Sequence, residues 1–108
     1  MEYTIDEYGN SYTHLDGKSH SYDDNPSVIY EDGDQCWHKH NKRHRDNDMP
    51  AIIRANGDRC WYKKGCYHRD NDLPAILLAN GHAEWWIDGK KIKECDNYFI
   101  ITRVKRAN

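Results

Sequence analysis

The chain lacks what a deep apolar core or a membrane span would need. Its 108 residues include one phenylalanine and two methionines, and its mean hydropathy is −1.13. The opening residues, MEYTIDEYGN, carry acidic side chains and no apolar run, unlike a signal peptide. We therefore predict a single small domain without a transmembrane segment, located in the cytoplasm. Eight tyrosines and four tryptophans are its main material for packing.

Several chemical signatures are also missing. The four cysteines form no CxxC pair, which favours free thiols in a reducing compartment over a disulfide framework. The chain has no P-loop, dinucleotide fingerprint, nucleophile elbow or helical two-histidine zinc motif. These absences predict a protein that is not an enzyme and that holds no cofactor.

Basic residues are nearly absent from the first third of the chain. Residues 1–34 hold nine acidic side chains and one basic side chain, Lys18, whereas residues 35–108 hold fifteen basic and nine acidic side chains. The formal net charge of −2 therefore conceals an electrical dipole along the sequence.

What the chain has in abundance is repetition. HRDNDMPAIIRANGDRCW at 44–61 and HRDNDLPAILLANGHAEW at 68–85 agree at twelve of eighteen positions, 24 residues apart. The same step along the chain finds further glycines, tryptophans, prolines and histidines in register. The marker residues of the two central copies and their neighbours are Gly33, Trp37, His44, Pro50, Gly57, Trp61, His68, Pro74, Gly81 and Trp85.

Each unit is typical of a β-hairpin. A short apolar run follows the proline, then comes Asp-Gly or Asn-Gly at 32/33, 56/57 and 80/81, which favours a two-residue turn with positive φ at both positions. A second strand carries the tryptophan, and a further turn at Gly17, Asn41, Gly65 and Gly89 reverses the chain again. HRDND then leads into the next proline.

The predicted fold class is all-β: a meander of stacked 24-residue hairpins forming an open single sheet or curved array with atypical ends. The units cover approximately residues 3–25, 26–49, 50–73 and 74–97. Residues 98–105, YFIITRVK, are predicted to form a capping strand over the last sheet edge.

The pattern W-x-x-x-G-x-x-H-R-x-x-x-x-P-A, with Asn-Gly before the tryptophan, resembles MORN-type repeats. WYKKGCYHR at 61–69 and WHKHNKRHR at 37–45 carry it, with Asn41 at the glycine position of the second segment. The chain is most similar to the divergent HRDNDLPA repeat proteins of giant DNA viruses. It departs from the MORN pattern where Arg and Asp replace a G-x-G after the histidine. The resemblance implies a hairpin array that serves as a scaffold, dimerisation module or lipid-proximal element.

The HRDND motif allows two interpretations. Histidine and arginine suit acid–base or anion chemistry. Alternatively, Asp and Asn set turn geometry while the arginine reaches a carboxylate in its own or the adjacent copy. We favour the structural interpretation, because catalysis needs one pocket with differentiated roles rather than identical copies.

A zinc site is a weaker possibility. Cys36, His38 and His40 alternate along one predicted strand, and His44 follows the turn, so four ligands of suitable type lie close in sequence. The next copy has no equivalent set, which favours polar strand residues on a solvated face.

Basic side chains cluster around the second turn of successive units, where stacking would align them along one edge. Trp86 is a departure from the repeat and a candidate exposed ring. The candidate binding residues are Lys39, Lys42, Arg43, Lys63, Lys64, Trp86, Lys90 and Lys91.

The predicted function is a repeat module for protein–protein interaction or self-association. The partner is a second copy or, if the protein is viral, a factor in the host cytoplasm. The alternative is a binder of phosphate-bearing ligands, namely nucleic acid, nucleotide or anionic lipid, through the basic edge.

Overall fold

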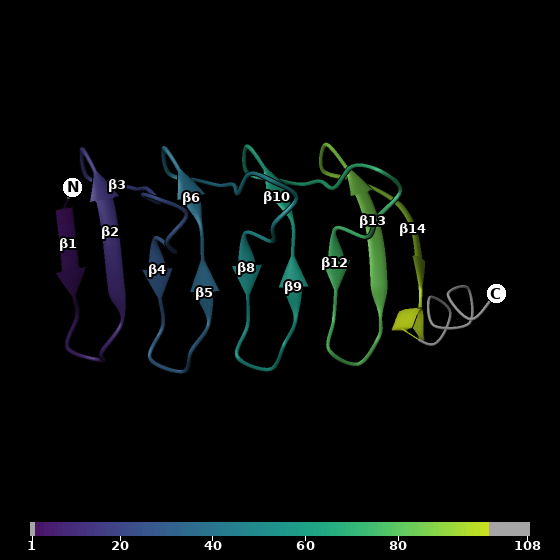
Figure 1. The fold of residues 1–108 in the computed structure, drawn as a ribbon, viewed down its shortest axis with the longest axis horizontal. Coiled ribbons are helices and arrows are strands. Elements are labelled where there is room, and N and C mark those ends of the chain that lie inside the picture. The colour runs from purple at the N-terminus through teal and green to yellow at the C-terminus, as the bar shows by residue number, and fades with distance from the viewer. Residues whose placement is uncertain (1, 100–108) are drawn as a thin grey trace.

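The computed structural model describes residues 2–99 and shows an open antiparallel sheet built from successive hairpins (Figure 1). The main sheet has ten strands in the order β1-β2-β4-β5-β8-β9-β12-β13-β14, with β3 paired to β2. The molecule extends 49 × 26 × 21 Å, with the strands lying side by side along its long axis. The predicted all-β meander is confirmed. No helix within the described residues is long and apolar enough to cross a membrane.

The strands are short in the middle of the array and longer at its ends. Those of the main sheet are β1 (Glu2–Ile5), β2 (Ser11–Leu15), β3 (Lys18–Ser19), β4 (Val28–Ile29), β5 (Gln35–Cys36), β8 (Ile52–Ile53), β9 (Arg59–Cys60), β12 (Ile76–Leu77), β13 (Ala83–Ile87) and β14 (Lys90–Cys95). Two small separate sheets are formed by β6 (His38–Lys39) with β7 (Lys42–Arg43), and by β10 (Tyr62–Lys63) with β11 (Cys66–Tyr67). The strands β4, β8 and β12 begin 24 residues apart, as the repeat does.

The lower turns, residues 6–10, 30–34, 54–58 and 78–82, join the two strands of each main hairpin. Tyr30 and Asp34 close one of them, since the Tyr30 amide donates to the Asp34 carbonyl at 2.9 Å and the Gly33 amide donates to the Tyr30 carbonyl at 2.9 Å. Only Gly33 has a positive φ, 98°, whereas Asp32 does not. The predicted two-residue turn with two positive φ values is therefore wrong. The loop has three residues, with glycine in the left-handed third position.

The side chain before the glycine explains this geometry. The carboxylate of Asp32 accepts the Asp34 amide at 2.9 Å, and the amide oxygen of Asn56 accepts the Asp58 amide at 2.9 Å. An Asp or Asn that bonds the backbone two residues further on holds its own backbone in a turn without needing positive φ.

Paired positive φ values occur in two other places. The upper turns, residues 15–18, 39–42, 63–66 and 87–90, have them at both central positions, as in His40 (49°) and Asn41 (68°). The crossing loops, residues 20–26, 44–50 and 68–74, which lead from one unit to the next, have them at the last two residues of the motif, as in Asn47 (63°) and Asp48 (56°). Asn and Asp tolerate this conformation better than other non-glycine residues.

Residues that pair directly across the sheet share a face, so the register defines a row of side chains that runs the length of the array. We call it the cysteine row: Tyr12, Val28, Cys36, Ile52, Cys60, Ile76, Glu84 and Glu94. Its centre, from Val28 to Cys60, is buried and belongs to the hydrophobic core together with Trp37 and Tyr62. Its last two members are glutamates, and the buried residues of the last two units form a second cluster instead, in which Trp61, Ala75, Leu77 and Ala83 are covered by Trp85 and Tyr98.

Small residues lie beneath the crossing loops. Ala51 and Ala75 are completely buried, and Ser27 occupies the same place in the unit before them. The proline that precedes each of these residues ends the crossing loop. The four cysteines are free, with Cys36 and Cys60 buried.

The C-terminal edge differs from the expectation. The strand that follows β13 is β14, at 90–95, and Tyr98 and Phe99 after it have helical backbone. Residues 100–105 of the predicted capping strand lie outside the described residues.

Candidate functional site

The arginine of HRDND is enclosed by the fold. The Arg45 Nε and Nη2 atoms donate to the two carboxylate oxygens of Asp24 at 2.9 and 3.1 Å, and Nη1 donates to the Pro50 carbonyl at 3.1 Å. Its guanidinium carbon lies 3.8 Å from the centre of the Trp37 ring. This hydrogen bonding from Arg45 lowers the pKa of Asp24, against the opposing effect of partial desolvation.

The next unit repeats the arrangement. Arg69 donates to the Asp48 carboxylate at 2.9 and 3.3 Å and lies 3.8 Å from the Trp61 ring centre. The Trp61 indole N–H donates to the Asp48 carbonyl at 2.9 Å. In the last unit Lys93 takes the arginine position and makes one contact of 3.2 Å with Asp72. The arginine thus ties each unit to the one before it.

The histidine of the motif ties each unit to the one after it. Nδ1 of His44 accepts the Lys64 amide at 3.1 Å, and Nε2 lies 2.8 Å from the Asp46 carboxylate. A ring that accepts at Nδ1 and faces a carboxylate at Nε2 is the neutral tautomer with its proton on Nε2. His68 makes the same pair of contacts, to the Asp88 amide at 3.0 Å and to Asp70 at 2.8 Å.

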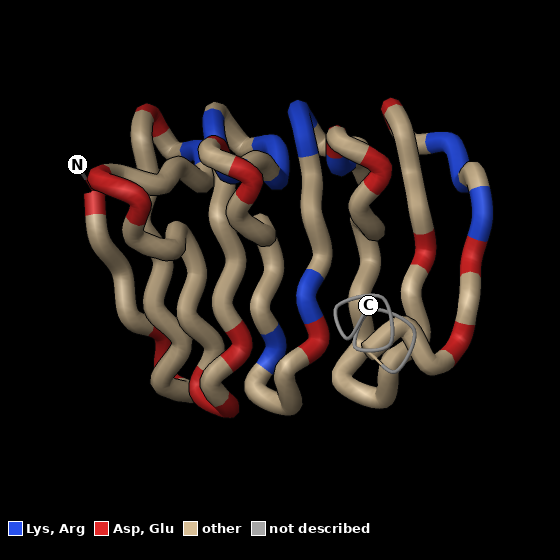
Figure 2. Tube along the Cα trace, turned by 45° about the vertical axis from the view of Figure 1, so that its right-hand side comes forward, with Lys and Arg blue, Asp and Glu red and all other residues tan. Residues whose placement is uncertain are grey.

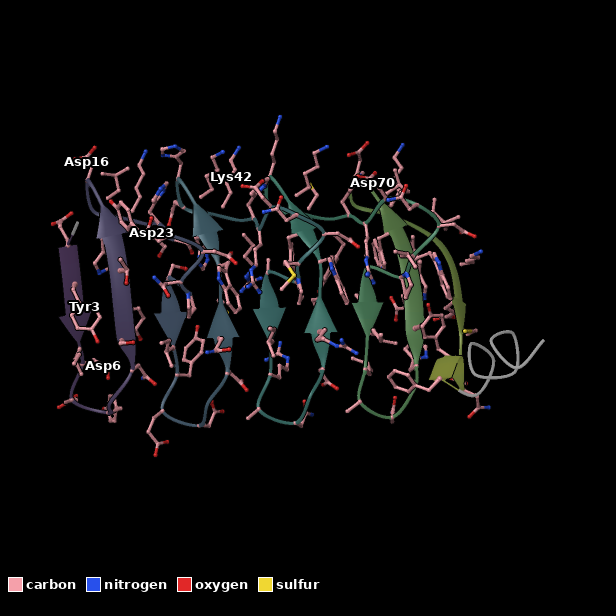
Figure 3. The ribbon with its side chains drawn as sticks, in the orientation of Figure 1. Tyr3, Asp6, Asp16, Asp23, Lys42 and Asp70 are labelled. Atoms are coloured by element: carbon pink, nitrogen blue, oxygen red, sulfur yellow. The ribbon has the colours of Figure 1, made fainter. Side chains whose placement is uncertain are left out.

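These contacts leave HRDND with structural partners at every position that could carry chemistry. Among the described residues, the lysines without an ion pair lie in the upper turns, which form the upper edge of the array. Figure 2 shows lysine and arginine along that edge in the middle and later units, next to acidic residues of the crossing loops and upper turns, and further acidic residues at the lower turns. Figure 3 places Lys42 at the upper edge, at the opposite end of the sheet from Asp6.

Three of the predicted binding lysines surround one hollow. Lys39, Lys42 and Lys64 line it together with His40 and His44, and its volume is about 270 Å³. We call it the lysine hollow. It lies where the upper turn of the second unit meets that of the third. Within residues 2–99, no carboxylate lies within 4.0 Å of the ammonium groups of these lysines.

The register makes this hollow more strongly cationic. Lys39 and Lys42 are directly opposite each other in the β6–β7 pair. Like charges at directly paired positions of an antiparallel ladder destabilise it. An anion in the hollow would relieve that repulsion.

The other predicted binding residues are dispersed. Lys63 and Lys90 are exposed and do not line the hollow, and Lys91 is paired with Glu94 at 2.6 Å. Arg43 lies over the Tyr62 ring at 5.5 Å. Trp86 is half-buried, not exposed as predicted: its ring packs against Tyr67 with centroids 5.1 Å apart, and its indole N–H donates to Glu84 at 2.9 Å.

The structure does not bring the four zinc candidates together. Cys36 is buried in the core, and His38 Nδ1 is 2.6 Å from the Ser27 hydroxyl. His40 is exposed in the upper turn, and His44 makes the two contacts described above. Among residues 2–99, only one group of three or more His, Cys, Asp or Glu side chains has its ligand atoms within 4.8 Å of one another, and these four residues are not in it.

That one group is His82, which directly precedes β13, with Glu84 of β13 and Glu94 of β14. No ion site was predicted from the sequence at these three residues. The only signal was a departure from the repeat, because the positions of His82 and Glu84 hold Asp58 and Cys60 one unit earlier.

A second hollow, of about 380 Å³, opens over the cysteine row between the first and third units. Cys36 and Ile52 contribute to its floor, and Tyr8, Tyr30 and Arg54 line its sides. Arg54 also forms a 3.5 Å ion pair with Asp34.

No protein-family model, curated protein or solved structure matches this chain. The MORN-type resemblance therefore stays a prediction from the residues.

Proposed function

We propose that the protein is a non-enzymatic binding module that holds phosphate-bearing ligands at its upper edge. The observation that carries this proposal is the lysine hollow, where Lys39, Lys42 and Lys64 meet without a carboxylate partner among the described residues. Phosphate oxygens suit ammonium donors, and the repulsion between the paired lysines falls when an anion binds. The HRDND arginines, Arg45 and Arg69, are already committed to the fold, so the lysines of the hollow are the groups available there for a ligand.

Three kinds of ligand carry phosphate groups of this type: nucleic acid, a free phosphate compound and an anionic membrane. Each would bind more weakly as the salt concentration rises, because the attraction is largely electrostatic. Inorganic polyphosphate, an RNA oligonucleotide and vesicles containing phosphatidylserine separate these sources in parallel titrations at low salt.

The decisive comparison uses two triple variants of equal charge. Lys39→Gln, Lys42→Gln and Lys64→Gln together should reduce binding of at least one probe about tenfold or more. Lys18→Gln, Lys63→Gln and Lys90→Gln remove the same charge from exposed positions outside the hollow and should have a much smaller effect. Equal losses in both variants, or no binding by the unmodified protein, would refute the proposal.

A second candidate function is binding of a protein partner, either another copy of the chain or a host factor if the protein is viral. The hollow over the cysteine row supports it, because Tyr8, Tyr30 and Arg54 are of the residue types that dominate protein interfaces. Tyr8 is 72% exposed and Tyr30 39% exposed, so both rings are accessible.

Sedimentation velocity over a wide concentration range tests the self-association form of this candidate. A double variant, Tyr8→Ser with Tyr30→Ser, should lower the mass of any oligomer. Tyr3→Ser is a suitable control, since Tyr3 is 62% exposed and does not line the hollow. A strictly monomeric protein would leave only a foreign partner for this surface.

A further inference from the structure

The last hairpin carries a square of polar side chains on one face. Glu84 and Glu94 are directly paired in the β13–β14 ladder, and the neighbouring positions on the same face are His82 and Asp96. His82 Nδ1 lies 2.8 Å from Asp96, and Nε2 lies 2.9 Å from Glu84 Oε2 and 3.6 Å from Glu94 Oε2. Three carboxylates thus surround one imidazole.

Directly paired glutamates repel each other, so a cation close to both Glu84 and Glu94 would stabilise this part of the ladder. In the structure Lys91 serves that purpose in part, with its ammonium 2.6 Å from Glu94 Oε2 and 3.9 Å from Glu84 Oε1. Glu84 presents Oε2 to His82, whereas Glu94 presents the same atom, Oε2, to both Lys91 and His82, and no second lysine among the described residues contacts either glutamate.

The square is also where the fourth unit lacks a contact that the two units before it make. Asp34 and Asp58 each accept the amide of the next unit, from Ala55 and Ala79, both at 2.7 Å. His82 stands at the equivalent position and cannot act as a carboxylate acceptor there. Its ring lies instead on the carboxylates of its own hairpin.

We propose that His82, Glu84 and Glu94 bind a divalent transition-metal ion of the zinc type, with Asp96 orienting the imidazole. The ligand atoms are His82 Nε2 and the Oε2 atoms of the two glutamates. Zinc bonds of about 2.0 to 2.1 Å place tetrahedral ligand atoms about 3.3 Å apart. The observed separations of 2.9 and 3.6 Å from Nε2 bracket that distance.

The surroundings of the square match what metal ligands need. The Nδ1–H of a metal-bound histidine is usually held by a carboxylate, and Asp96 is in place for that bond. The Trp86 indole N–H holds the Oε1 atom of Glu84 at 2.9 Å, which leaves Oε2 directed at the site. Zinc would take the place of the proton on His82 Nε2 and would displace Lys91 from Glu94. One position would remain for water.

A nitrogen ligand favours zinc-type ions over magnesium or calcium, which prefer oxygen ligands. The side chains of His82 and Glu84 are only 25% and 19% exposed, so an ion there would be partly shielded from solvent. Cys95 cannot contribute, because it pairs with Ala83 and therefore lies on the opposite face of the sheet.

The test is calorimetric titration of the full chain with zinc chloride, with thermal unfolding measured in parallel. We expect one equivalent of zinc to bind and to raise the unfolding temperature. His82→Gln and Glu94→Gln should each weaken zinc binding about tenfold or more, and Asp96→Asn about tenfold. Lys91→Met should tighten binding, because the competing ammonium group is gone.

Two controls separate this site from others. His40→Gln removes an imidazole of the Cys36 region, and Cys66→Ser removes an exposed thiol; both should leave zinc affinity unchanged. The proposal is overturned if the unmodified protein binds no zinc, if His82→Gln binds as tightly as the unmodified protein, or if His40→Gln abolishes binding. Lys91→Met keeps the test decisive should His82→Gln fail to fold, since a purely structural ion network predicts no gain in zinc affinity.

Discussion

The Arg69 guanidinium lies 3.8 Å from the centre of the Trp61 ring while its Nε donates to Asp48 Oδ1 at 2.9 Å. Asp48 belongs to the crossing loop that precedes Trp61. The Arg69 side chain therefore holds together this loop, the Trp61 ring and the unit that follows the loop. The charge is mostly buried, with 14% of the arginine side chain exposed. The motif that looks like a duplicated active site therefore serves the packing of one unit on the next.

Removing this arginine should destabilise the fold. Arg69→Met retains the aliphatic contact with Trp61 but loses the carboxylate pair and the bond to the Pro74 carbonyl. We expect a loss of about 2 kcal/mol in the free energy of unfolding, measured by urea denaturation. Lys63→Met, at an exposed lysine of the same unit, is the control and should change little. An unchanged stability in Arg69→Met would contradict the structural role.

The fourth unit offers the reverse experiment. Lys93 stands where the other units have arginine, makes a single contact with Asp72, and lies 4.9 Å from the Trp85 ring centre. Lys93→Arg should supply a forked contact and a closer stack, adding about 0.5 kcal/mol to stability. A rise in unfolding temperature would support it. Lys90→Arg, on the same strand but without a ring partner, should leave the unfolding temperature unchanged.

The sequence was sufficient to predict the architecture because the residues that recur with its period have strong preferences for particular backbone conformations and packing positions. Tryptophan, proline and glycine recur every 24 positions, and the strands β4, β8 and β12 recur with them. The turn types were harder to predict from the sequence than the architecture. Asn-Gly favours a two-residue loop, but the Asx contact of Asn56 with Asp58 selects a three-residue loop in which Gly57 alone has positive φ.

The candidate sites were harder to predict because both depend on register. Lys39 and Lys42 are three residues apart in sequence and become directly opposed only because the upper turn has two residues. Glu84 and Glu94 meet across β13 and β14 because the register shifts between Trp85 and Trp86; without that shift the turn would place Glu84 opposite Lys93. Sequence spacing indicated a basic edge but not which lysines share a hollow, and it placed Trp86 in solvent when Tyr67 covers it.

The upper turn of the second unit is the least favourable of its kind, since Asn41 carries positive φ (68°) where the other three units have glycine. Asn41→Gly should stabilise the protein by up to about 1 kcal/mol, because glycine adopts this conformation without strain. Asn41→Val should cost more than that. The measurement is urea denaturation of both variants. Equal stability of the glycine and valine variants would show that the turn is not under backbone strain.

Ser27 and His38 form a polar pair that the two later units replace with alanine and an aromatic residue. The Ser27 hydroxyl is 2.6 Å from His38 Nδ1 and donates to the Cys36 carbonyl at 3.1 Å. Burial, with a smaller effect from the nearby Arg43 charge, lowers the pKa of His38 below its ordinary value of 6.5. The unfolded chain therefore binds this proton more readily than the folded one, so stability is full above about pH 6.5 and falls as the pH drops below it.

His20 contributes in the same direction, because burial and the nearby His40 and Lys39 charges lower its pKa as well. A double variant, Ser27→Ala with His38→Tyr, reproduces the Ala51 and Tyr62 of the next unit. We expect its free energy of unfolding to decline less than that of the unmodified protein between about pH 7.5 and pH 5.5, since only His20 remains to titrate with this sign.

The single variants test whether the pair is coupled. Ser27→Ala alone leaves His38 Nδ1 half-buried without its hydroxyl partner, and His38→Tyr alone places a phenol ring beside a buried serine. The losses in the free energy of unfolding of the two single variants should add up to more than the loss of the double variant. We expect a coupling of about 1 kcal/mol at neutral pH in a double-mutant cycle. Additive effects, together with an unaltered pH profile in the double variant, would mean that the serine and histidine act independently and that another group sets the acid sensitivity of the fold.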